Sequence, residues 1–282
     1  MEKAKTTAED RAYIPLEGYM KKITLVLTNQ MAEGGTLRIV TFATHSEGTF
    51  DDLKKDMTNN KLDLHVIGWG EKWINYMHKL KSVRECISKF HPKDVVIILD
   101  AFDTRMRAGR TTEDILAIYN VDFDGHGVVF SKQNNVILVP DFMSKYIIHR
   151  VFGGMANAGM YVGRIEDMLP VLDDAIKLSN SCKGDDQCGF NKLLHDHDIR
   201  IDEHYKLFKN LEYSERAQNI NEHTADAVFY GYPGSLTFSR LSRVPREYFP
   251  FLWREIVLMI IVIVAIFVMV SRLFASRKKT SK

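Results

Sequence analysis

Cysteine is scarce in this chain, whose 282 residues contain only Cys86, Cys182 and Cys188. An odd and sparse set is unlike the disulfide framework of a small secreted protein. We therefore expect reduced thiols, with a Cys182–Cys188 bridge as the alternative. The chain also lacks Asn-x-Ser/Thr sequons, and its charged opening over residues 1–22 has no apolar stretch of the kind found in secretory signals. These absences predict that the main domain faces the cytosol.

An excess of charge of one sign is missing as well. Lys and Arg number 38 against 36 for Asp and Glu, so the overall field favours neither nucleic acid nor an acidic partner. With 45% apolar residues, the chain can bury a large core. No repeat, low-complexity tract or linker precedes Pro245. We expect an N-terminal segment over 1–36 and a single globular domain over 37–245.

Long apolar runs are absent except for one near the C-terminus. Residues 256–270, IVLMIIVIVAIFVMV, are apolar without interruption, with Arg254 and Arg272 as flanking charges. The run predicts one membrane-spanning helix within residues 246–274, followed by a basic tail over 275–282. A buried core helix is the alternative. Because no signal peptide is present, the pattern favours a C-terminal anchor in the lipid bilayer, with the preceding domain in the cytosol.

Strand-like and helix-like segments alternate along the globular part. Apolar runs typical of buried strands occupy residues 37–44, 62–70, 94–100, 127–131 and 199–202. Patterns typical of helices occupy residues 49–59, 74–90, 111–120, 165–179, with a kink expected at Pro170, and 185–197. This alternation predicts an α/β fold, in which a mostly parallel, Rossmann-type sheet has helices on both faces.

Two carboxylates stand where the most apolar strand ends. Asp100 closes the run VVIIL, and Asp103 lies in the turn that follows. Open α/β sheets bind ligands beyond the carboxyl ends of their strands, so both carboxylates can reach one cation there. Hard oxygen ligands suit Mg²⁺ or Mn²⁺, and diphosphate oxygens can complete the coordination. The structural alternative is that Asp103 caps a helix and Asp100 closes the turn.

Six short motifs follow one another in a fixed order between about Leu37 and Gly234. They are VTFATHSEGTF, GWGEKW, LDAFD, VVFS with a later VPD, NAGMYVG and GDDQCGF. Each motif is weak alone, but their order resembles the glycosyltransferase domain of the procollagen lysyl hydroxylases and, more loosely, the collagen galactosyltransferases. In that family NAGMYVG corresponds to a turn, and the later LFKNL, Leu207 to Leu211, corresponds to a strand. The resemblance implies a GT-A-like domain.

The resemblance also implies roles for individual residues. Asp100 and Asp103 would hold Mn²⁺, or alternatively Mg²⁺, while Asp185 and Asp186 would act on the donor sugar as catalytic residues. The nucleotide-sugar-binding residues would be Thr44, Lys79, Phe102, Asn157, Gln187 and Gly231. Among them, Phe102 would stack on uracil. The alternative for Asp185 and Asp186 is an N-cap and first-turn acid of the helix that follows.

Together, the C-terminal apolar run and the family resemblance imply a membrane-anchored, divalent-metal-dependent glycosyltransferase. It would move a hexose, glucose or galactose, from a UDP-sugar to the hydroxyl of an unidentified glycan, protein or lipid acceptor. Tyr230 stands where the family has a metal-binding His, Tyr232 replaces an Asn, and Val139 replaces a Trp. Water, His223 or the diphosphate would then complete the metal site. The alternative function is a catalytically inactive, glycosyltransferase-like binding or scaffold protein at a membrane.

Overall fold

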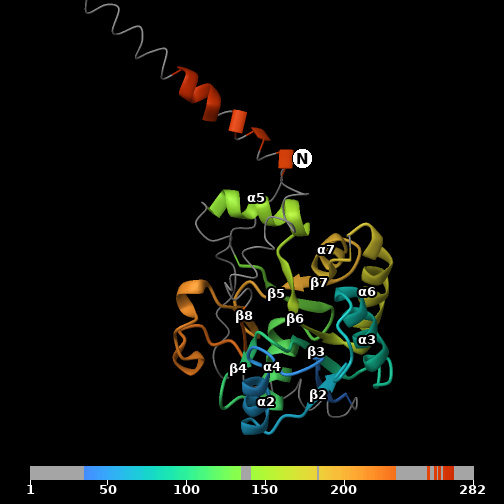
Figure 1. Ribbon diagram of the computed structural model, residues 1–282. Helices are drawn as coiled ribbons and strands as arrows, with labels where there is room; N and C mark the ends of the chain where they lie inside the picture. Colours follow the sequence, from blue (N-terminus) through green and yellow to red (C-terminus); the bar gives the residue numbers. More distant parts are fainter. Residues whose placement is uncertain are drawn as a thin grey trace, which may run out of the picture. The chain divides into compact units, whose positions relative to one another are not determined.

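The computed structural model describes residues 35–134, 141–182 and 184–232, together with short pieces between 253 and 269. The chain forms two compact units, one made of residues 1–133 and 156–233 and the other of residues 134–155 and 234–282. The first unit contains all the strands and all but one of the helices described below (Figure 1).

A six-stranded sheet forms the centre of the first unit. Its strands, in spatial order, are β2 (Leu64–Ile67), β1 (Leu37–Phe42), β3 (Val95–Asp100), β6 (Ala156–Arg164), β5 (Val128–Lys132) and β7 (Ile199–Ile201). β6 runs antiparallel to both neighbours, whereas the pairs β1–β2, β1–β3 and β5–β7 are parallel. The predicted mostly parallel α/β sheet is confirmed. The expected turn at NAGMYVG was wrong, because these residues lie within the reversed strand β6.

Helices cover both faces of the sheet, as predicted. They are α2 (Phe50–Asn59), α3 (Tyr76–Ile87), α4 (Thr112–Asp122), α6 (Ile165–Lys177) and α7 (Asp186–Lys192). Alternate residues of β3 point to opposite faces: Val96 and Ile98 pack in the core with α3, α6 and α7, and Ile97 packs in the core with α2 and α4. Figure 1 shows α3, α6 and α7 gathered on one side of the sheet.

Several strands of the central sheet have an end at the edge where Asp100 lies, which is the edge predicted to carry the site. Phe42 at the end of β1 is in register with Asp100 at the end of β3. Because β6 is reversed, its beginning reaches this same edge, where Asn157 pairs with Ser131 near the end of β5. Residues from four consecutive strands of the spatial order β1-β3-β6-β5 therefore meet at one edge.

A second, three-stranded sheet lies beside the central one. It has the order β4 (Thr104–Met106), β9 (Phe229–Gly231) and β8 (Phe208–Asn210). β8 agrees with the strand expected at LFKNL. β4 begins directly after Asp103, so no helix starts there, and the alternative in which Asp103 caps a helix was wrong.

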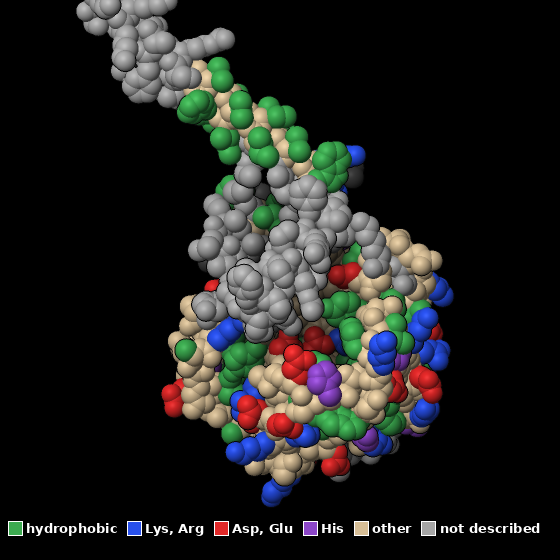
Figure 2. Space-filling view, viewed as in Figure 1, with side chains coloured by type: hydrophobic (Ala, Val, Ile, Leu, Met, Phe, Trp, Pro, Cys, Tyr) green, Lys and Arg blue, Asp and Glu red, His purple; other side chains and the backbone are tan. Residues whose placement is uncertain are grey.

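The second unit contains α5 (Asp141–Phe152), a helix that the sequence analysis did not predict. Its Phe142 and Tyr146 side chains are exposed. Among the described residues, no helix has the length and apolar content needed to cross a membrane. The predicted span 256–270 is described only at 257–258, 260–261 and 263–269, where its apolar side chains are exposed (Figure 2). The remainder of that span, most of 1–36 and all of 275–282 lie outside the described residues.

Candidate active site

Lys79 joins the two acidic motifs that the sequence analysis singled out. The side chain of Asn75 caps α3 by accepting a hydrogen bond from the His78 backbone amide at 2.9 Å, which places Lys79 in the first turns of that helix. The Lys79 ammonium is buried, pairs with Oδ1 of Asp100 and lies 3.7 Å from Oδ2 of Asp186. The Lys79 ammonium therefore links the end of β3 to the start of α7.

Charge compensation sets the protonation of this cluster. Burial alone would lower the pKa of Lys79, but Asp100 and Asp186 outweigh it and hold that pKa above its ordinary value. Burial raises the pKa of Asp186 to about 6, with Lys79 opposing the rise and Asp100 and Asp185 adding to it. Asp186 therefore changes its charge close to neutral pH, which is a property of many catalytic carboxylates.

Tyr161 on β6 lies among the same charges and was not predicted as a site residue. Burial raises the pKa of its hydroxyl, an effect that Lys79 opposes and Asp186 adds to. Within the described part of the chain, this buried hydroxyl has no hydrogen-bond partner. No local sequence signal distinguishes Tyr161 from an ordinary core aromatic residue.

Gly159 allows the backbone of β6 to approach the Asp100 side chain closely. A Cβ atom added at Gly159 would lie 3.1 Å from Asp100 Oδ2 and 2.9 Å from Asn157 Oδ1. The backbone amide of Gly159 donates a 2.9 Å hydrogen bond to that same Asn157 oxygen. Any larger residue would have to displace one of these two polar side chains, so this position explains the need for glycine in NAGMYVG.

Three amide side chains gather beside the charged cluster, one from each of three segments. Gln133 Oε1 accepts hydrogen bonds from Asn157 Nδ2 at 2.8 Å and from Gln187 Nε2 at 3.0 Å. We call these three residues the amide cluster. Asn157 and Gln187 were predicted, whereas Gln133 was missed. The available signal was its position just after a strand, the same rule that singled out Asp100.

The predicted nucleotide side is formed by loops that follow β1, β2 and β3. The Thr44 carbonyl accepts a 2.9 Å hydrogen bond from Gly70 in the GWGEKW motif, which ties the first two loops together. The ring of Phe102, which is half-buried, lies 5.3 Å from the ring of His45 and 6.5 Å from that of Phe50. Thr44 and Phe102 are thus positioned at the sheet edge where Asp100 ends β3.

Asp185 does not share the position of Asp186. Its Oδ1 accepts a 2.7 Å hydrogen bond from the backbone amide of Cys188, so the N-cap alternative is confirmed for Asp185, and Asp186 occupies the first turn of α7.

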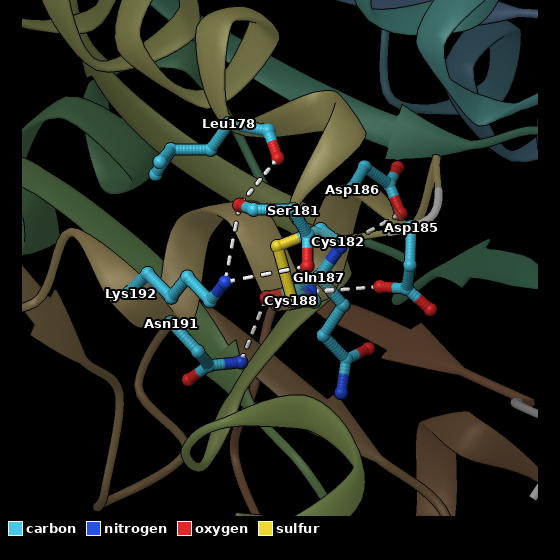
Figure 3. Close-up of a disulfide and its surroundings, with 9 residues drawn as sticks. All are labelled: Leu178, Ser181, Cys182, Asp185, Asp186, Gln187, Cys188, Asn191 and Lys192. Carbon is cyan, nitrogen blue, oxygen red and sulfur yellow. Dashed lines mark hydrogen bonds between the residues drawn. A yellow bond between two sulfur atoms is a disulfide. The ribbon is translucent and has the colours of Figure 1, made fainter. Parts of the chain in front are cut away.

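The expectation of reduced thiols was wrong for two of the three cysteines, because Cys182 and Cys188 form a disulfide (Figure 3). Cys86 is free, as expected.

Neither Tyr230, which replaces the family's His, nor His223, which was considered as a third metal ligand, is grouped with the two aspartates. Tyr230 is buried against Leu211 and Ile220, and its hydroxyl donates to the Ala225 carbonyl. His223 is buried with its ring 5.6 Å from that of Tyr230, and this burial lowers the pKa of His223. Throughout the residues that the structure describes, no three His, Cys, Asp or Glu side chains are grouped as a metal site.

Gly231 and Asp103 are linked to the site through the backbone. Gly231 on β9 pairs with Thr104, and a Cβ atom there would lie 2.1 Å from Asn210 Oδ1. The backbone amide of Tyr232 donates to the Asp103 carbonyl at 2.6 Å. The second sheet therefore holds the turn that contains Asp103.

The donor set is consistent with a hard divalent cation. The Asp100 side chain is 37% exposed despite its ion pair, and Asp103 is half-buried. Mg²⁺ in particular is commonly held by one or two carboxylates together with water and substrate phosphate oxygens. Asp100 and Asp103 are the residue types that such a cation takes, and they are the two residues that would hold it.

Comparison with known proteins agrees with the class that this fold and these acidic motifs define. The family model described as the PLOD GT domain matches residues 33–232. The chain therefore belongs to the family of procollagen lysyl hydroxylase glycosyltransferase domains, whose members use a nucleotide-sugar donor and an acceptor.

A solved structure described as a glycosyltransferase involved in the glycosylation of the major capsid of PBCV-1 also aligns with this chain. The alignment has a TM-score of 0.49 and 12% sequence identity, and covers 71% of this chain and 96% of the other. No curated protein sequence matches the chain.

Proposed function

We propose that this domain transfers a hexose, glucose or galactose, from a UDP-sugar to an acceptor hydroxyl with the aid of Mn²⁺ or Mg²⁺. The observation that carries the proposal is the buried pairing of Lys79 with both Asp100 and Asp186. The diphosphate and the sugar are adjoining parts of one donor molecule. A site for this donor needs a part that binds the cation next to a part that binds the sugar. The Lys79 ion pairs support the proposal because they bring Asp100 and Asp186, the residues proposed for these two parts, close together.

Each group in the cluster has a distinct role in this proposal. Asp100 and Asp103 would hold the divalent cation, which when bound supplies Lewis-acid stabilisation of charge on the departing diphosphate. Lys79 fixes the carboxylate of Asp100 and balances the buried charge of Asp186. An ionised Asp186 would stabilise positive charge at the anomeric carbon or orient the acceptor hydroxyl. Asp185 would act indirectly, by capping the helix that carries Asp186.

Release of UDP by the full chain tests the proposal. We expect Mn²⁺-dependent UDP release from UDP-glucose or UDP-galactose. We expect Asp103→Ala to lower it about 100-fold or more, because half of the carboxylate set is lost. The matched control is Asp63→Ala, which removes an exposed carboxylate outside the site. An absence of metal-dependent UDP release by the wild type with both donors would contradict the proposed activity.

A catalytically inactive binding or scaffold protein is the second candidate function. The specific observation in its favour is that Tyr230, which replaces the family His, packs in a small core instead of reaching a metal. The same experiment separates the two candidates. A scaffold would bind UDP or the UDP-sugar without releasing UDP, and Asp103→Ala would then alter binding only.

The amide cluster is proposed to bind hydroxyl groups of the donor sugar. Amides present both a donor and an acceptor, so they can distinguish sugars that differ in the orientation of one hydroxyl. We expect Gln133→Ala to change the ratio of kcat/KM for UDP-glucose and UDP-galactose by about fivefold, since one hydrogen bond contributes about 1 kcal/mol. Gln218→Ala, at an exposed position, is the control. A proportional loss with both donors would assign Gln133 a purely structural role.

Anchoring in a lipid bilayer through residues 256–270 is part of the same proposal. The described residues in this run, among them Leu258, Ile261 and Phe267, have exposed apolar side chains. Exposed apolar side chains of this kind favour contact with lipid or another apolar partner. The acceptor is unidentified, and the cytosolic location of the domain stays a prediction.

A further inference from the structure

The segment that carries Asp186 is closed by the disulfide between Cys182 and Cys188. Cys182 follows the short 3-10 helix η1 (Leu178–Asn180), and Cys188 lies in the first turn of α7. The bridge joins Cα atoms 5.6 Å apart. Asp185, Asp186 and Gln187 lie between its two cysteines in the sequence, and Figure 3 shows their side chains beside the disulfide.

Backbone hydrogen bonds reinforce this closed segment from both ends. The amide of Cys182 donates to the Leu178 carbonyl at 3.0 Å, and the amide of Asp185 donates to the Cys182 carbonyl at 2.9 Å. The Asp185 side chain in turn accepts from the amide of Cys188 at 2.7 Å. Both cysteines therefore take part in the hydrogen bonds that form the N-terminus of α7.

The helix has little stability of its own to maintain this arrangement. α7 contains only seven residues, well below the length at which an isolated helix is stable in water. Its first turn must nevertheless hold Asp186 against Lys79 and Gln187 against Gln133. Covalent closure immediately beside these two residues restricts the conformations that the turn can adopt.

We propose that the Cys182–Cys188 disulfide is a positioning element of the transferase site, which holds Asp186 and Gln187 in their reactive arrangement. This inference rests on the proposed function. Reduction by two equivalents of a low-molecular-weight thiol breaks the S–S bond. Each cysteine sulfur gains one electron and one proton, and the thiol is converted to its own disulfide. The freed turn then places Asp186 less precisely, and turnover falls.

The disulfide also bears on where the domain works. Disulfides persist in oxidising compartments and are rare in the cytosol. A transferase that needs this bridge would be active with its domain in an oxidising compartment and weakly active in a reducing one. The bridge therefore weighs against the cytosolic placement predicted from the missing signal peptide.

Kinetics of the full chain test the proposal. Mass spectrometry after alkylation without reductant should show Cys182 joined to Cys188. Treatment with dithiothreitol, or the double substitution Cys182→Ser/Cys188→Ser, should lower kcat for the preferred UDP-sugar about 10- to 100-fold, with a smaller change in KM. The double variant should not respond further to dithiothreitol. Cys86→Ser, which removes the free thiol, should behave like the wild type and remain sensitive to the reductant.

The contrary outcomes are equally defined. Free thiols at both positions in an active enzyme, or wild-type kcat in the double variant, would overturn the proposal. A lower melting temperature with unchanged kcat would show a purely structural bridge and would overturn it as well.

If the oxidised wild type releases no UDP, the proposed function fails, and hydrogen exchange then tests the positioning role by itself. Faster exchange confined to residues 184–190 after reduction would support positioning. Unchanged exchange there would exclude it.

Discussion

Replacing Lys79 with methionine should lower the free energy of unfolding of the metal-free protein by about 3 kcal/mol at pH 7, since the variant leaves the buried carboxylate of Asp186 without its cationic partner. Lys79 is 5% exposed, and its ammonium pairs with the carboxylates of Asp100 and Asp186. Methionine preserves much of the length and the apolar stem, so the change isolates the charge. Chemical denaturation followed by circular dichroism measures the effect.

Two further variants show whether the lost charge is the cause. Lys81→Met changes an exposed lysine on the same helix and should stay within about 0.5 kcal/mol of the wild type. Combining Lys79→Met with Asp186→Asn removes one of the unpaired carboxylates and should recover part of the lost stability. If Lys79→Met alone is as stable as Lys81→Met, the ammonium does not balance the two acids.

The second large effect is expected for Asp186→Asn, which should lower kcat by about 100- to 1000-fold, because an amide cannot supply the negative charge proposed to act on the sugar. Asp185→Asn is the matched control. Asparagine also caps helices well, so α7 should keep its N-terminus and kcat should fall far less. Steady-state assays of UDP release measure both variants. Equal losses in the two variants would contradict the separation of roles between Asp185 and Asp186.

The stability of the protein should depend on pH through Asp186. Burial raises the pKa of Asp186 to about 6 from an ordinary value of 3.8. In the folded protein the carboxyl therefore binds its proton more tightly than in the unfolded chain. Its contribution to stability is fully present below pH 3.8 and is lost as the pH rises through 6. Relative to Asp186→Asn, the wild type should lose about 3 kcal/mol across that interval.

Activity should change in the opposite direction over the same range. An ionised Asp186 is required by the proposed mechanism, so kcat/KM should rise with pH up to about 6 and then level off. The small residual activity of Asp186→Asn should lack this rise. A wild-type profile that is flat between pH 5 and 7 would show that Asp186 is not titrating in the reaction.

Local patterns predicted most of the central fold. The run VVIIL and the helices on both of its faces were recognised because burial and periodicity are properties of short segments. The reversed strand β6 was missed because NAGMYVG was interpreted, through the family resemblance, as a turn. Gly159 is present instead because Asp100 and Asn157 approach the backbone. β4 and β9 have three residues each and acquire their partners only through tertiary contacts.

The candidate site was predicted in part, and mainly through family motifs. Asp100 could be identified from its strand end alone. The ion pairs of Lys79 depend on where α3 and α7 pack, which no spacing within either helix specifies. The sequence analysis kept the disulfide only as an alternative, because the number of cysteines does not indicate the turn that brings Cys182 and Cys188 together.

The reversed strand β6 divides the site between two stretches of the chain. Thr44, Lys79 and Asp100 come from the stretch before it in the sequence, on the β2-β1-β3 half of the sheet, whereas Asp186 and Gln187 come from the stretch after it. Within the sheet the two halves are joined only through β6, but α3 and α7 also bring Lys79 and Asp186 together across it. A chimaera assembled from two relatives at β6 would therefore have to match Lys79 from one parent with Asp186 from the other, because this ion pair crosses the junction.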